Sequence, residues 1–86
     1  MKYEYKTSDI VCSQKIILDI DDNTDIINDC LFVGGCSGNT KGVSSLVRGL
    51  SVNDVINKLE GIKCGNKPTS CPDQLANALK EYLNNK

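Results

Sequence analysis

Residues Lys63–Leu79 read KCGNKPTSCPDQLANAL, and we expect the rest of the chain to be built around them. It brings two cysteines, Cys64 and Cys71, to the expected start of a helix. Ser70 or Cys71 suits the N-cap and Pro72 suits the first helical position. A thiolate here would face unpaired backbone N–H groups and the positive end of the helix dipole. Because thiolates bind metals and attack electrophiles, this segment is the expected functional centre of the chain.

The length and composition of the chain limit what it can be. Its 86 residues predict a single domain, residues 1–86, near the lower size limit for unaided folding. Aromatic bulk is limited to three Tyr and one Phe, so a metal, a disulfide or a partner chain is expected to add stability. Ten basic residues nearly balance eleven acidic ones, which argues against nucleic-acid binding and membrane binding. The longest apolar run, Cys30–Val33, is too short to span a bilayer.

The N-terminus and the cysteine content together predict a compartment and a chemistry. Residues 1–6 lack the apolar stretch of a secretory leader, so we expect a cytosolic chain, in which disulfides seldom persist. Five cysteines then favour metal binding or reactive thiols over a disulfide framework. Histidine is absent, which removes the commonest general base and the commonest non-sulfur metal ligand. Any metal site is therefore expected to be rich in thiolates.

Hydrophobic periodicity predicts three strands followed by about three helices. The strands are expected at residues 2–7, 15–20 and 26–33, with a turn at 21–24. The helices are expected to begin near Lys41, at the Ser51 cap and at Pro72, and the last is expected to end at about Leu83. The predicted buried faces are Val43, Leu46, Val47 and Leu50, then Val55, Ile56 and Leu59, then Leu75, Ala78, Leu79 and Tyr82. This order indicates an α+β fold, a three-stranded antiparallel meander with the helices packed on one face.

Four cysteines lie at predicted element boundaries: Cys12, Cys36, Cys64 and Cys71. They could form one tetrahedral thiolate site, for which zinc is the first candidate and an iron–sulfur cluster the second. Their spacing leaves four separate structural thiols as an alternative, since no Cys-x-x-Cys pair occurs. Cys30 lies inside a predicted strand and is expected to be a small buried core residue.

The glycine-rich segment at residues 34–39, reading GGCSGN, precedes the first predicted helix. Its N–H donors, a hydroxyl group and the nearby Lys41 are features that bind anions. The segment matches neither the phosphate-loop spacing nor the dinucleotide fingerprint. A nucleotide site is therefore less favoured than the cysteine site.

The residues Thr69–Asp73 spell TSCPD, and Gln74 follows them. Together with GGCSGN at 34–39 and the short length, they make the chain resemble the stand-alone group of the TSCPD domain family. Four characteristic cysteines describe that group, and they correspond to the four boundary cysteines given above. Related domains occur at the C-terminus of cobalamin-dependent ribonucleotide reductases. The resemblance thus implies an accessory role near such an enzyme, through metal binding or thiol exchange, and no catalysis by this chain alone.

A weaker resemblance links the order of the cysteines to iron–sulfur scaffold proteins of the NifU/IscU type. Those proteins have a meander sheet covered by helices and gather their cysteines at one end. The scaffold family has Gly-Asp after its first cysteine, whereas Cys12 is followed by Ser-Gln, and Ser70 replaces the scaffold histidine. Three interpretations follow: a closed zinc site, thiol–disulfide exchange through Cys64 and Cys71 with a reductase or other redox partner, and a cluster scaffold.

Overall fold

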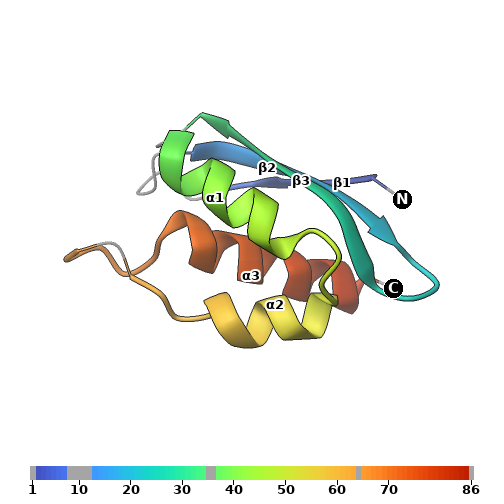
Figure 1. The fold of residues 1–86 in the computed structure, drawn as a ribbon. Coiled ribbons are helices and arrows are strands. Elements are labelled where there is room, and N and C mark those ends of the chain that lie inside the picture. The colour runs from blue at the N-terminus through green and yellow to red at the C-terminus, as the bar shows by residue number, and fades with distance from the viewer. Residues whose placement is uncertain (1, 8–12, 35–36, 64, 86) are drawn as a thin grey trace.

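A three-stranded antiparallel sheet forms one layer of the protein, and three helices form the other (Figure 1). The structure is a computed structural model that describes residues 2–7, 13–34, 37–63 and 65–85. The strands are β1 (Lys2–Lys6), β2 (Ser13–Asp21) and β3 (Ile26–Gly34), and the helices are α1 (Ser37–Val47), α2 (Val52–Leu59) and α3 (Cys71–Asn84). This arrangement confirms the predicted α+β fold, with a meander sheet in the order β1-β2-β3.

Alternation along β2 decides which face of the sheet carries the core. Ile16, Leu18 and Ile20 are fully buried, whereas Lys15 and Ile17 on the opposite face are only half-buried. Successive side chains of a strand point to opposite faces. One apolar face of β2 therefore packs under the helices. Helix α2 packs mainly on α3, so it extends the helical layer away from the sheet (Figure 1).

The turn between β2 and β3 is tied to two helices. Asp25 has a left-handed backbone (φ 57°), which aspartate tolerates better than most residues. Its N–H donates to the carbonyl of Asp21 (2.7 Å), and its carbonyl accepts the N–H of Val52 at the start of α2 (2.8 Å). Its carboxylate accepts the hydroxyl of Tyr82 in α3 (3.0 Å). The closed end of the hairpin is thereby fixed to the helical layer.

Helix α1 begins earlier than the sequence predicts. It starts at Ser37 rather than near Lys41, so Gly38 and Gly42 lie inside it. Each glycine in a helix interior costs about 1 kcal/mol relative to alanine. The helix packs along β3 (Figure 1), and tertiary packing of this kind supplies most of the stability of helices in proteins. Contact with the sheet therefore outweighs the local preference of the glycines.

The buried face of α1 also differs from the prediction. Three residues at helical spacing are at most 7% exposed, namely Thr40, Ser44 and Val47. Leu46, which was predicted to be buried, is 76% exposed, and Val43 and Leu50 are only partly buried against the core. Thr40 and Ser44, which have small side chains with hydroxyl groups, thus occupy the contact with β3. A pattern of apolar residues does not predict such positions. The prediction for Leu46 is wrong for that reason.

Replacing Leu46 with glutamine is expected to change the free energy of unfolding by less than about 0.5 kcal/mol, because the side chain already lies in water. The control is Val47→Ala at the next position, whose side chain is 3% exposed. That variant is expected to lose about 1–3 kcal/mol. Urea unfolding followed by circular dichroism measures both. Equal losses in the two variants would contradict the orientation of α1.

The starts of α2 and α3 confirm the predicted caps. The Ser51 hydroxyl accepts the N–H of Asp54 (3.2 Å), and the Ser70 hydroxyl accepts the N–H of Asp73 (3.2 Å). Ser70 is the N-cap, so Cys71, the alternative cap, is instead the first helical residue of α3. The predicted inward residues of α3 are at most 1% exposed: Leu75, Ala78, Leu79 and Tyr82.

The helices are short. The longest, α3, has 14 residues. Across the described residues, no helix combines the length and the apolar character needed to cross a membrane.

Candidate metal site

Of the four predicted metal ligands, Cys71 is the one that the structure describes. Cys12, Cys36 and Cys64 lie outside the described residues. Within the described ranges, no group of three or more Cys, His, Asp or Glu residues is placed to hold a metal ion. The predicted four-thiolate site therefore stays a prediction, and the described residues around Cys71 show what surrounds its sulfur.

The sulfur of Cys71 lies against the start of β2. Its Sγ is 3.2 Å from the Oγ of Ser13, within hydrogen-bond distance, and either atom can donate. Both residues are buried, at 5% and 3% exposure. Ser13 directly follows Cys12 in the chain. The contact therefore brings two predicted site segments, 58 residues apart in sequence, to one point.

The ends of the strands meet at the same place. Ser13, the first residue of β2, pairs with Gly34, the last residue of β3, and Gly34 lies two residues before Cys36 in sequence. Thr7 holds the other side, since its hydroxyl donates to the carbonyl of Ser13 (2.6 Å). The start of β2, the end of β3 and the first turn of α3 thus lie together at one end of the molecule (Figure 1).

The hydroxyl of Ser70 joins the start of α3 to the segment that precedes it. Besides capping the helix, it donates to the carbonyl of Ile62 (2.7 Å). Ile62 lies two residues before Cys64 in sequence. The same hydroxyl therefore orders the first turn of α3 and fixes the chain on the approach to Cys64.

The carboxylate of Asp73 provides a second link across this segment. Its Oδ1 accepts the N–H of Gly61 (2.7 Å), and its Oδ2 accepts the hydroxyl of Thr69 (2.5 Å). The side-chain amide of Gln74 donates to the same Thr69 hydroxyl (3.0 Å). Thr69 and Gln74 are buried. These bonds hold both ends of the 61–69 segment against the helix that begins with Cys71.

A family profile described as "TSCPD domain" matches residues 1–83. The chain belongs to the TSCPD domain family. No curated protein and no solved structure matches the chain. The second resemblance, to scaffold proteins of the NifU/IscU type, is therefore not supported by these comparisons. In this TSCPD domain, Thr69, Ser70 and Asp73 of the TSCPD motif form hydrogen bonds at the start of α3. The sulfur of Cys71 lies next to Ser13.

Cys30 of the TSCPD domain lies away from this point and has the role predicted for it. It sits in the middle of β3, is 1% exposed and belongs to the apolar core. Burial raises the pKa of its thiol from 9.0 to about 11, and a hydrogen bond with Ser44 only partly offsets that effect. A thiol that stays protonated at neutral pH is a poor metal ligand and a poor nucleophile.

The raised pKa of Cys30 predicts a loss of stability in alkali. The folded state disfavours the thiolate, so this contribution is complete below pH 9 and is lost as pH rises towards 11. Two pKa units correspond to roughly 2–3 kcal/mol. Urea unfolding of the reduced protein between pH 8 and 11 is compared with that of Cys30→Ala. We expect the stability advantage of the unmodified protein to shrink across this range, and parallel curves would contradict the prediction.

The polar partners at the start of α3 are only partly visible in the sequence. In the sequence, Ser13 stands out only as a departure from the scaffold pattern, and Thr69 and Gln74 only as residues of the TSCPD motif and its continuation. A hydroxyl residue directly after a predicted ligand, at the start of a strand, is a sign that could have pointed to Ser13. The partners of Thr69 and Gln74 depend on tertiary geometry, which single residues in a sequence do not reveal.

Proposed function

We propose that this TSCPD domain binds one zinc ion through Cys12, Cys36, Cys64 and Cys71. The single observation that carries the proposal is the contact between the Cys71 sulfur and Ser13, the residue next to Cys12. Four thiolates satisfy the usual coordination of structural zinc. The bound zinc would act as a crosslink between the sheet and the helices, adding the stability that a small core lacks.

Chain connectivity supports the proposed ligand set. Cys12 is one residue from Ser13, Cys36 is two residues from Gly34, and Cys64 is two residues from Ile62. Consecutive Cα atoms are about 3.8 Å apart, so each cysteine is limited to about 8 Å from a residue anchored near Cys71. Chain length therefore allows the four sulfur atoms to reach a common ion.

The charge balance is also compatible with zinc. Four thiolates around a dication leave two excess negative charges. The N-terminus of α3 supplies N–H groups and a positive dipole end at Cys71, and Lys63 and Lys67 lie in the adjoining segment. The carboxylate of Asp73 accepts hydrogen bonds from the N–H of Gly61 and the hydroxyl of Thr69. The positive groups near Cys71 are therefore compatible with the excess negative charge of a four-thiolate zinc site.

Burial of Cys71 favours metal binding over thiol exchange. A thiol that attacks a disulfide must be accessible to its partner, and Cys71 is 5% exposed.

We further propose that the domain acts as an accessory to a ribonucleotide reductase and is not a catalyst by itself. Membership of the TSCPD family supports this role. Binding to that reductase, measured with and without zinc by calorimetry, tests it.

Metal analysis of protein purified without oxygen tests the zinc proposal. We expect about one zinc per chain, tetrahedral sulfur coordination by X-ray absorption, and reduced zinc content in serine variants of each of the four cysteines. A metal-free, fully folded protein would overturn the proposal and favour thiol exchange. A visible absorption band after loading with iron and sulfide, with no zinc retained, would favour the cluster scaffold instead.

A further inference from the structure

Among the residues that the structure describes, none pairs with the outer edge of β3 over part of its length. In the order β1-β2-β3, β3 is an edge strand. Its beginning is covered, because Ile27 exchanges backbone hydrogen bonds with Gly49 and Leu50 (2.8 and 2.9 Å). Further along, the N–H of Cys30 donates to the carboxylate of Asp29 (2.9 Å) and not to β2. Since ladder hydrogen bonds alternate along a strand, the backbone groups of Phe32 also face outward.

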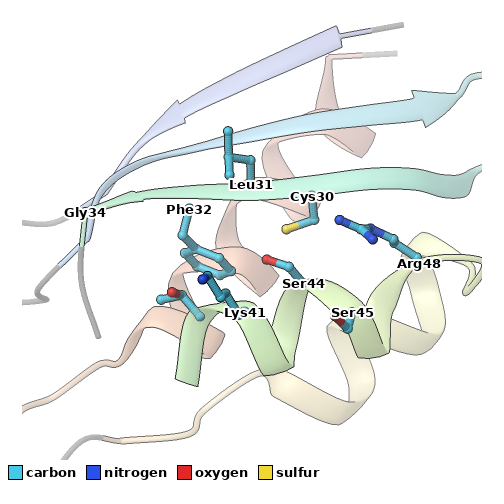
Figure 2. Close-up of a pocket in the computed structure, with 9 residues that line it drawn as sticks. Cys30, Leu31, Phe32, Gly34, Lys41, Ser44, Ser45 and Arg48 are labelled. Atoms are coloured by element: carbon cyan, nitrogen blue, oxygen red, sulfur yellow. The ribbon is translucent and has the colours of Figure 1, made fainter. Parts of the chain in front are cut away.

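Helix α1 runs beside this edge and forms a groove with it. The groove has a volume of about 570 Å³. Figure 2 shows Cys30 and Phe32 pointing from β3 towards α1, with Lys41 on the facing helix and Arg48 just after its last residue. Ser44 and Ser45 contribute hydroxyl groups between them. An edge strand beside a helix is an arrangement that accepts an added strand, with pockets for alternate side chains.

The charges along the groove indicate what kind of strand fits. Lys41 lines it from α1 and Arg48 from the turn that follows α1, and Arg48 forms an ion pair with Asp29 (3.0 Å). Two cations against one carboxylate leave the groove positive, in a chain whose net charge is −1. Leu31, on the opposite face of β3, is 55% exposed. Acidic side chains suit the helix side of the groove, and apolar side chains suit the side of Leu31.

We propose that the edge of β3 from Cys30 to Gly34 binds an extended acidic segment of a partner protein as a fourth strand. The backbone of the segment pairs with the outward groups around Phe32. Alternate acidic side chains face Lys41 and Arg48, and the apolar ones between them cover Leu31. This surface uses none of the four boundary cysteines, and its Gly34 end lies two residues before Cys36.

Titration of ¹⁵N-labelled full-length protein with the peptide acetyl-Glu-Val-Glu-Val-Glu-amide tests the proposal. We expect saturable amide shifts concentrated in residues 30–34 and 41–48. Two matched peptides are controls: the same peptide N-methylated at residues 2 to 4 keeps the charge but lacks the central N–H donors, and acetyl-Lys-Val-Lys-Val-Lys-amide reverses the charge. Both are expected to bind at least about tenfold more weakly, a difference of 1.4 kcal/mol.

A pair of charge reversals completes the test. Lys41→Glu is expected to weaken binding of the Glu-Val peptide about tenfold, whereas Lys58→Glu on α2 is expected to leave it within about twofold. Equal binding of the N-methylated peptide, shifts centred outside the groove, or equal effects of the two reversals would overturn the proposal. A dimer that is detected by sedimentation velocity and forms through β3 would also overturn the proposal, because a second copy would then occupy the edge.

Discussion

Replacing Cys71 with serine is expected to abolish zinc binding and to lower the free energy of unfolding of the zinc-loaded protein by at least about 3 kcal/mol. Binding energies of structural zinc sites are larger than this, and they are lost as folding energy when the site fails. For a chain of this size, the loss corresponds to a fall in Tm of roughly 12 °C or more. Zinc content and thermal unfolding, measured on the same preparation, check the prediction.

The matched control for that variant is Cys30→Ser, since both cysteines are buried. Cys30 is expected to tolerate serine with a loss of about 1 kcal/mol and full zinc content, because its neighbours are the core and Ser44. Repeating both thermal unfolding experiments with a chelator separates the contribution of zinc to stability from that of side-chain packing. Without zinc, the large loss of stability in the Cys71 variant should vanish. Equal melts of the two variants with zinc present would contradict the assignment of Cys71 to the site.

The parts of the fold that sequence predicts well depend on short-range rules. The β-branched, apolar run at residues 15–20 predicts a strand, and β2 (Ser13–Asp21) covers it, because such residues favour the strand conformation. The serines at positions 51 and 70 predict the starts of α2 and α3, because a capping hydroxyl satisfies an N–H of the first turn of its own helix. These relations involve neighbours within a few residues, so the sequence contains all that they need.

The features that sequence predicts poorly depend on what lies opposite in space. The outward position of Leu46 follows from contact between β3 and the face of α1 that carries Thr40 and Ser44. The contact between Ser13 and Cys71 joins residues 58 positions apart. In the same way, the groove beside β3 exists only because α1 lies along that edge. Each of these depends on the placement of whole elements, which local periodicity does not determine.

Replacing Asp73 with alanine is expected to lower the free energy of unfolding by about 2–3 kcal/mol. Its carboxylate accepts one hydrogen bond from the N–H of Gly61 and one from the hydroxyl of Thr69. Hydrogen bonds to a charged group contribute about 1.5–3 kcal/mol each, and the partial exposure of this carboxylate reduces that figure. The loss also leaves the buried Thr69 hydroxyl without its acceptor. Urea unfolding of the metal-free protein measures the effect without a contribution from zinc.

The chain offers a closely matched control in Asp54→Ala. Asp54 stands three residues after the Ser51 cap, as Asp73 stands three residues after the Ser70 cap, so both carboxylates meet a similar helix dipole. Asp54 is exposed, and its removal is expected to cost no more than about 1 kcal/mol. The difference between the two losses therefore measures the bonds to Gly61 and Thr69 alone. If those bonds anchor the segment that carries Cys64, Asp73→Ala must also weaken zinc binding while Asp54→Ala leaves it unchanged. Equal zinc affinities in the two variants would show that Asp73 of the TSCPD motif does not support the metal site.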